Sequence, residues 1–247
     1  MGNYFLPGTP LPYTPPPLEF VSANPVPDQS PALIDPEGSP VKVPLMCNAG
    51  GELKGLRLTH ELTDKSVVVI MGGFWRLERC SVFGYSCSAT GLMLTDFAAA
   101  EVRECSFGGG SASAIVLMRR SSLIAHALVI QGVQHGLDCV EEASCFVTNS
   151  TIRNNEIGVC LGGTAQVKIH DSSLVDNGAA LTVMALSCSV GQENEVNTYG
   201  TLELVGCVII GQLWYTHLNF RYRMQHFIDE GNTYLRASPG SLQLGVP

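Results

Sequence analysis

Four polar residues in the middle of the chain have the types that acid–base catalysis needs. His170 and Asp171 are adjacent, Lys168 lies two residues earlier, and Arg103 is a cation further upstream. A histidine titrates near neutral pH, and neighbouring charges can orient it or stabilise developing charge. This group is therefore the best enzymatic candidate in the sequence. His126 is of interest with His170, because two histidines that lie close together can share a metal ion.

Cysteine is the other residue type with possible chemistry, and the chain has nine. Nine is an odd number, there is no C-x-x-C pair, and the spacings do not suit a zinc site. We therefore expect reduced, buried thiols in an intracellular protein, with no metal and no cofactor.

Composition limits the classes of protein to consider. The chain has 247 residues, of which 45% are hydrophobic and 15% are charged, so it can fold around a large core and is not a disordered or coiled-coil protein. The net charge is 14 − 22 = −8, which argues against binding nucleic acid. No apolar run is long enough to span a membrane, and we expect neither a signal peptide nor membrane association.

The first 46 residues differ from the rest. Twelve of the fourteen prolines lie between Pro7 and Pro44, so this arm is expected to be extended rather than helical. Apolar side chains recur along it, and we expect them to anchor the arm on a partner; the alternatives are a flexible tail or an arm that packs on its own domain. The predicted anchor residues are Tyr4, Phe5, Leu6, Tyr13 and Phe20.

From about residue 50 the sequence repeats with a period of about 22–25 residues. Within each period, short segments alternate apolar with polar or small residues, which predicts β-strands and no helix of any length. The repeating segments are Leu56–Leu58, Cys80–Val82, Cys105–Phe107, Leu128–Ile130, Ser150–Ile152, Ser172–Leu174 and Cys207–Ile209.

A chain with such a repeat buries its inward residues by coiling, so that each turn stacks about 4.8 Å above the last. This pattern resembles the right-handed parallel β-helix (pectin-lyase-like) superfamily, and in particular its non-catalytic intracellular members. The predicted fold is all-β: a right-handed parallel β-helix solenoid of about seven turns with an extended proline-rich N-terminal arm. The predicted divisions are an arm at residues 1–46, repeats at 47–211 and a C-terminal cap and tail at 212–247.

The repeat predicts which residues share a column along the solenoid. His126 and His170 fall two turns apart, about 9–10 Å, which is too far for one metal ion. Opposite charges alternate on neighbouring turns, which favours stabilising ion pairs over a catalytic cluster. The two predicted outward columns are Arg76, Glu101, Ile124, Phe146, Lys168 and Glu203, and beside them Glu78, Arg103, His126, Thr148, His170 and Val205.

The last part of the chain departs from the repeat. Residues 187–200 are polar and acidic and are predicted to form a loop that leaves the solenoid. After Gly211 an alternation of apolar and basic residues predicts a strand that closes the open end of the core. The alternative is an edge that binds a partner, for which Trp214, Arg221 and Arg223 are the candidate residues.

The sequence lacks the paired carboxylates that sugar-cleaving enzymes of the superfamily carry, so no catalytic residue is predicted and the chain is not expected to be an enzyme. The leading interpretation is a structural scaffold, a β-helix body that its arm anchors in a large intracellular assembly of the cytoplasm or cytoskeleton. Tubulin or other axonemal proteins of a cilium are the specific partners considered. The first alternative is a protein that binds or acts on carbohydrate, and the second is a trimeric virion or capsule protein.

Overall fold

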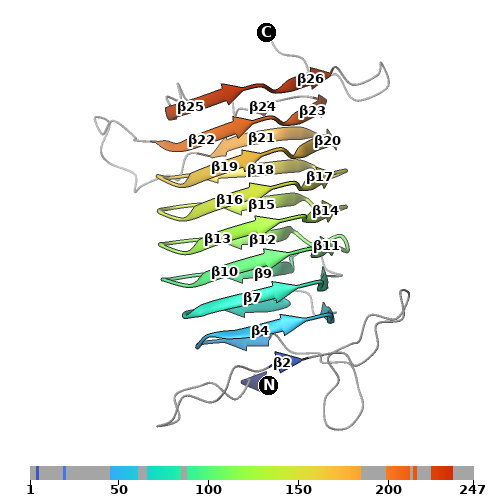
Figure 1. Ribbon diagram of the computed structural model, residues 1–247, viewed down its shortest axis with the longest axis vertical. Coiled ribbons are helices and arrows are strands. Elements are labelled where there is room, and N and C mark those ends of the chain that lie inside the picture. The colour runs from blue at the N-terminus through green and yellow to red at the C-terminus, as the bar shows by residue number, and fades with distance from the viewer. Residues whose placement is uncertain are drawn as a thin grey trace.

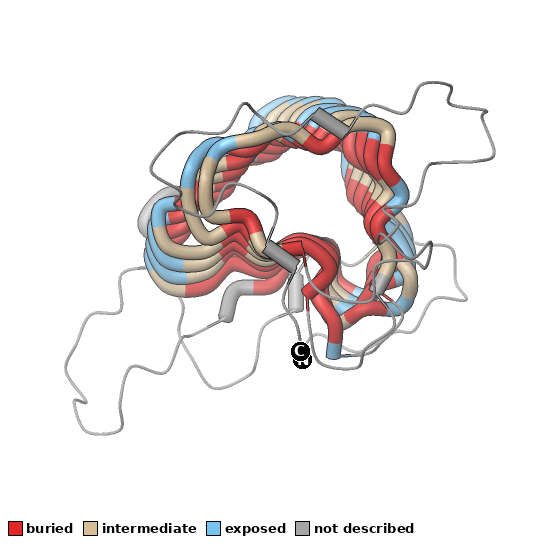
Figure 2. Tube along the Cα trace, turned by 90° about the horizontal axis from the view of Figure 1, so that it is seen from below, coloured by how far each residue is buried: buried red, intermediate tan, exposed pale blue. Residues whose placement is uncertain are grey.

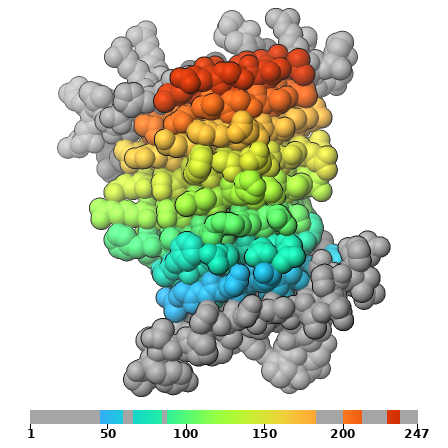
Figure 3. Space-filling view, in the orientation of Figure 1, coloured from blue at the N-terminus to red at the C-terminus, as the bar shows by residue number. Residues whose placement is uncertain are grey.

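The computed structural model describes residues 4–5, 19–20, 45–60, 66–84, 88–184, 199–211, 214–215 and 224–235. Regular structure in these residues consists of β-strands that form three parallel sheets. The chain crosses the three sheets in turn and then begins the next coil one strand higher (Figure 1). Successive coils therefore follow the order of the sequence along the solenoid, as the layers of colour in Figure 3 show.

The first and second sheets each have nine strands, and the third has eight, within the described part of the chain. The first sheet contains β1 (Tyr4–Phe5), β3 (Leu45–Cys47), β6 (Val68–Ile70), β9 (Thr90–Leu94), β12 (Ser113–Leu117), β15 (His135–Cys139), β18 (Ile157–Gly162), β21 (Ala179–Met184) and β24 (Trp214–Tyr215). The second contains β2 (Glu19–Phe20), β4 (Gly51–Lys54), β7 (Phe74–Glu78), β10 (Ala99–Arg103), β13 (Ser122–His126), β16 (Ser144–Thr148), β19 (Gln166–His170), β22 (Tyr199–Val205) and β25 (Met224–Glu230). The third contains β5 (Arg57–His60), β8 (Ser81–Gly84), β11 (Ser106–Gly108), β14 (Val129–Gln131), β17 (Thr151–Arg153), β20 (Ser173–Asn177), β23 (Val208–Gly211) and β26 (Thr233–Leu235).

This architecture confirms the predicted right-handed parallel β-helix, and the expected number of turns is close to the one observed. The strand register also follows the sequence repeat. Leu117 pairs with Leu94 and Cys139, and Cys139 pairs with Leu161, as the alignment of periods predicts. The polar insertion at residues 187–200 does not disturb this alignment. β22, at the end of the insertion, pairs in register with β19, which precedes the insertion in the chain.

The bend between the second and third sheets is the same in successive coils. Its first residue has a positive φ whether or not it is glycine, for example Glu104 (52°), Ala127 (54°) and Asn149 (49°). This left-handed conformation is unfavourable for residues with a Cβ atom. The same bend in each coil keeps the strands on either side in register, so the stacked hydrogen bonds offset the local cost.

The second residue of this bend forms a ladder of buried side chains along the solenoid. Ser150 Oγ accepts the backbone N–H of Leu128 at 3.0 Å, and Ser172 Oγ accepts that of Ser150 at 3.1 Å. Cys105 Sγ accepts the N–H of Cys80 at 3.3 Å in the same way. The cysteines and serines that begin the repeating segments therefore share one column, and they satisfy backbone donors that the sheets leave unpaired at these bends.

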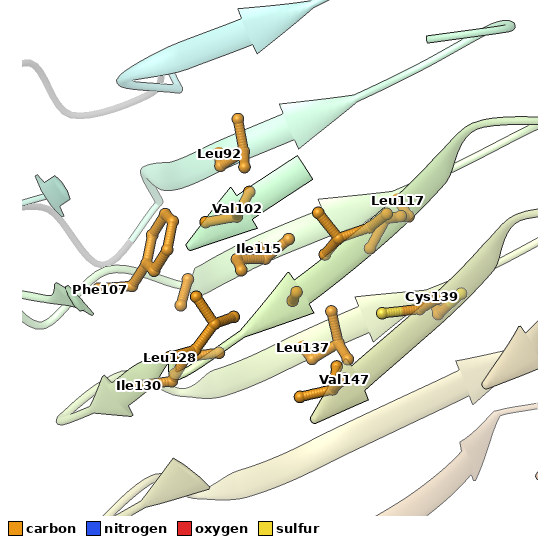
Figure 4. Close-up of a cluster of buried hydrophobic side chains, with 14 of the residues drawn as sticks. Leu92, Val102, Phe107, Ile115, Leu117, Leu128, Ile130, Leu137, Cys139 and Val147 are labelled. Carbon is orange, nitrogen blue, oxygen red and sulfur yellow. The ribbon is translucent and has the colours of Figure 1, made fainter. Parts of the chain in front are cut away.

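Inward residues of the three sheets form one continuous core, to which successive coils from β3 to β23 contribute. Figure 2 shows the buried residues around the inside of the ring that the coils form when viewed along the solenoid. In the middle coils Leu92, Ile115 and Leu137 stack on one wall of the solenoid. They belong to the same buried cluster as Val102 and Phe107, which come from the other two walls (Figure 4). Burial of these stacked columns supplies the main stabilising free energy of the fold.

Two short segments of the N-terminal arm pair with the first coil of the body. The backbone of Tyr4–Phe5 lies beside β3, and that of Glu19–Phe20 lies beside β4, both in parallel. The remaining residues of the arm and most of the 187–200 insertion lie outside the described residues.

The C-terminal end of the described solenoid carries a polar group over the core. Asp229 of β25 pairs with the buried Leu204, so it occupies an inward column. Its carboxylate accepts hydrogen bonds from Asn232 Nδ2 at 2.6 Å and from the Tyr234 hydroxyl at 2.7 Å. Asn232 also continues the ladder, because its Oδ1 accepts the N–H of Cys207 at 2.6 Å. A hydrogen-bonded carboxylate therefore occupies an inward column in the last described coil. The capping role of residues 212–247 stays a prediction.

The ladder predicts a specific cost for removing one hydroxyl. Replacing Ser150 with alanine leaves the buried N–H of Leu128 without its acceptor, so we expect a loss of about 1–3 kcal/mol in the free energy of unfolding. Urea unfolding measures it. Ser144→Ala, on the outer face of the second sheet, is the matched control and should change stability by less than about 0.5 kcal/mol. Equal effects of the two substitutions would show that the ladder does not stabilise the fold.

The position of Asp229 predicts that an apolar residue in its place causes the protein to self-associate. In Asp229→Leu the inward column ends on an apolar side chain beside the edge of β25, and such edges associate. We expect the mass measured by light scattering to rise with protein concentration. Glu230→Leu, one residue further and in an outward column beside Val205, should not behave so. An Asp229→Leu protein whose mass matches the control at every concentration would contradict this role.

Candidate functional site

The outer face of the second sheet carries most of the polar residues that the sequence singled out. Strand register places them in the two predicted columns, which run across β7, β10, β13, β16, β19 and β22. The face divides into three zones along the solenoid: a charged cluster around Glu101, an uncharged band on β13 and β16, and a second charged cluster around Glu203.

In the first cluster Glu101 binds two arginines. Arg103, on the same strand, forms an ion pair with one carboxylate oxygen, and Arg76 Nε of the neighbouring strand contacts the other at 3.0 Å. Hydrogen bonds from Arg103 and then Arg76 lower the pKa of the Glu101 carboxyl. A carboxylate that is held ionised in this way is a poor proton donor or acceptor near neutral pH.

The second cluster has the same design. Glu203 accepts Lys168 Nζ at 2.9 Å and His170 Nε2 at 2.8 Å through its two oxygens. These contacts, first Lys168 and then His170, lower the pKa of the Glu203 carboxyl. The structure therefore brings Lys168 and His170 together, as the sequence suggested, but on a glutamate rather than on Asp171. Arg103 does not join them, because three strand spacings separate β10 from β19 and it is paired with Glu101.

Between the clusters, β13 and β16 present no charged side chain on the outer face except the ionisable imidazole of His126. Ile124 and Phe146 are neighbours in one column, and His126 Nδ1 lies 2.9 Å from the hydroxyl of Thr148 in the next. The ring of His170 meets Phe146 edge-to-face, with centroids 5.0 Å apart. We call Ile124, Phe146, His126 and Thr148 the uncharged band. It is an apolar surface with hydroxyl and imidazole groups along one side.

The edge of the second sheet where each strand begins carries a third set of ion pairs. Arg120 Nε contacts Glu142 at 2.8 Å one coil later, and the carboxylate of Glu141 accepts the backbone N–H of Arg119 at 2.7 Å. The side chain of Arg119 pairs with Asp96 in the other direction. The side chain of Arg120 therefore pairs with the coil after it, whereas the side chain of Arg119 pairs with the coil before it.

Sequence reasoning missed a buried polar cluster on the first sheet. Asp138 is almost fully buried; it accepts the Ser113 hydroxyl at 2.5 Å and lies 3.0 Å from His135 Nδ1. The hydrogen bond to Asp138 raises the pKa of His135, although partial burial opposes this. An aspartate inside the otherwise apolar segment Gly136–Cys139 was the available signal, because a buried carboxylate needs partners. Its partners come from the start of the same strand and from the coil before.

The described cysteines are free and buried. Burial raises the pKa of the Cys47 thiol and of the Cys139 thiol to about 12, so both are protonated and unreactive near neutral pH. Cys87 and Cys188 lie outside the described residues.

The predicted partner-binding residues are placed only in part. Tyr4, Phe5 and Phe20 have their backbones in β1 and β2, and Trp214 has its backbone in β24, at the edge of the first sheet. Leu6, Tyr13, Arg221 and Arg223 lie outside the described residues. Their role in binding a partner stays a prediction.

No set of three or more His, Cys, Asp or Glu side chains in the described part of the chain is arranged to hold a metal ion. Nor does a described segment form a helix of the length and apolarity that crossing a membrane requires.

Three parallel sheets, a repeated bend and stacked side-chain columns define a right-handed parallel β-helix protein, and two clusters of paired charges lie on the outer face of its second sheet. Comparison with protein families gives the same result, because the model of the right handed beta helix region matches residues 60–197. The chain belongs to the right-handed β-helix family.

Among solved structures, the crystal structure of pectate lyase Pel9A is similar in fold, with a TM-score of 0.46 and 11% sequence identity. The match covers 76% of this chain and 62% of that one, so this chain spans less than two thirds of the lyase. A search of curated proteins finds no match.

The Asp138 contact predicts a pH dependence of stability. Because the pKa of His135 is raised above 6.5 in the folded state, its stabilising effect is complete below that pH and is lost as the pH rises through the folded value. We expect the free energy of unfolding of the wild type to exceed that of His135→Gln by more at pH 5.5 than at pH 9. His126→Gln, on an exposed histidine of the second sheet, is the control. A pH-independent difference for His135→Gln would contradict the prediction.

Proposed function

We propose that the chain is a non-catalytic scaffold: a rigid β-helix body that its proline-rich arm anchors in a large assembly inside the cell. The observation that supports it best is the use of the carboxylates on the second sheet. Glu101 accepts hydrogen bonds from two arginines, and Glu203 accepts them from Lys168 and His170. These contacts lower the pKa values of both carboxyls and leave them stabilising the surface rather than poised for proton transfer.

The rest of the body supports the same function. Continuous core columns and the ladder of buried hydroxyls and thiols make each coil a template for the next, which suits a stiff spacer more than a mobile catalyst. An exposed aliphatic side chain, that of Ile124, remains on the second sheet of this stiff body. Rigid elements that present apolar side chains are suited to binding other proteins.

The arm is the proposed anchor. A proline-rich segment is already extended, so it loses little conformational entropy when it docks along a partner. In this proposal the backbone pairing of β1 with β3 and of β2 with β4 fixes the position of the arm on the body. The aromatic residues Tyr4, Tyr13 and Phe20 contact the partner. We place the assembly in the cytoplasm or cytoskeleton, with tubulin or other axonemal proteins of a cilium as the first partners to test.

A carbohydrate-binding role is the second candidate. The observation that favours it is Phe146, an aromatic ring beside the hydroxyl and imidazole groups of the uncharged band, since aromatic rings with adjacent hydrogen-bonding groups bind sugars in many proteins. Its edge-to-face contact with His170 fills part of the space that a stacked sugar would use.

The scaffold proposal predicts how the full-length chain fractionates in cells. We expect the tagged wild type in the pellet that resists detergent and salt, and a variant with Tyr4, Tyr13 and Phe20 changed to serine in the supernatant. Phe97→Ser, which removes an exposed aromatic side chain of the body, should pellet like the wild type.

Either of two results would overturn this proposal. A freely soluble wild type would remove the assembly, and an arm variant that pellets like the wild type would remove the anchor. A strong signal for the wild type in a polysaccharide-binding screen, combined with a soluble wild type, would favour the second candidate.

A further inference from the structure

The uncharged band lies between two cationic rims, although the protein as a whole is acidic. On one side the side chains of Arg76 and Arg103 are 46% and 55% exposed, whereas Glu101 beneath them is 14% exposed. On the other side Lys168 is 52% exposed and Glu203 is 20% exposed. In both clusters the carboxylate is the inner group, so a molecule that approaches this face meets positive charge.

The centre of the face is apolar and accessible. Ile124 is 56% exposed in the middle of its column, between the two charged clusters. Phe146 adjoins it on the next strand. An aliphatic side chain offers no flat platform for a sugar ring, whereas it packs well against an apolar side chain of a peptide.

The distance between the two cationic rims determines which residues of an extended peptide can contact both of them. Three strand spacings separate β10 from β19, which is about 14 Å. In an extended chain, residues i, i+2 and i+4 point to the same side, and the first and last are also about 14 Å apart. Acidic residues at i and i+4 would therefore reach the two rims while the residue at i+2 lies over Ile124 and Phe146.

We propose that this face of the second sheet binds an extended acidic segment of a partner protein, with the pattern acidic–any–apolar–any–acidic, lying along the solenoid across β10, β13, β16 and β19. This inference rests on the proposed scaffold function and names a second contact besides the arm. The exposed carboxylates of Glu104 and Asp171 lie at the bend beyond the strand ends, and they keep the segment over the central columns.

The test uses the full-length chain and a labelled peptide that contains Glu-Ser-Leu-Ser-Glu, at low salt. We expect amide resonances of Ser122–His126 and Ser144–Thr148 to shift on titration, and the affinity to fall as salt is added. Peptides with lysine in place of both glutamates, or with glycine in place of leucine, should bind at least about tenfold more weakly.

Variants of the protein locate the site. Arg103→Gln and Lys168→Gln should each weaken binding about two- to fivefold, because each removes one exposed charge and leaves the glutamate with its other partner. Ile124→Asp should weaken it by about tenfold or more. Arg120→Gln, at the edge of the sheet and outside the band, is the control and should bind like the wild type.

Three outcomes would overturn the inference: no shifts on the second sheet, equal binding of the lysine peptide, or an acidic oligosaccharide that shifts the same resonances more strongly than the peptide. Because the fractionation experiment depends on the arm, a wild type that pellets but does not bind the peptide would overturn this inference alone.

Discussion

In-register stacking of parallel strands is the constraint on which the rest of this structure depends. When each coil repeats the bend of the coil before it, a residue lies about 4.8 Å from its counterparts above and below. The residues of one column must therefore be able to pack against, or hydrogen-bond to, one another. Inward columns become continuous stacks of Leu, Ile, Val and Cys, and the second bend position becomes a ladder in which Ser150 and Ser172 each accept an N–H from the previous coil.

The same constraint explains how much of the fold the sequence could predict. A period of 22 to 25 residues leaves few alternatives to a coil, and a buried column tolerates little except small or apolar residues. The alignment of Leu94, Leu117, Cys139 and Leu161 could therefore be derived by counting residues along the chain. The segments that do not repeat, such as the arm and the 187–200 insertion, offered no such count.

Contacts of side chains were less predictable than columns. Counting residues places Arg76, Glu101 and Arg103 on one face, but it does not say that both arginines converge on one carboxylate, because long side chains reach along and across strands alike. For the same reason the side chain of Arg119 contacts Asp96 in the coil before it, while that of its neighbour Arg120 contacts Glu142 in the coil after it. Ser113, Asp138 and His135 were overlooked because the contact depends on the burial of one aspartate, which period and polarity alone do not reveal.

In a solenoid, a local change of sequence alters the surface of one or two coils and leaves the fold of the neighbouring coils unchanged. On the second sheet, ion pairs around Glu101 and Glu203 cover the outer face of several coils. They are absent from β13 and β16, where Ile124 and Phe146 occupy the same column. Those coils need the same bend and the same core as their neighbours, so nothing in the fold requires an aliphatic side chain at an exposed position there. Packing therefore does not explain Ile124. Its place beside Phe146 and between two cationic rims is what the proposed acidic segment with a central apolar residue would use.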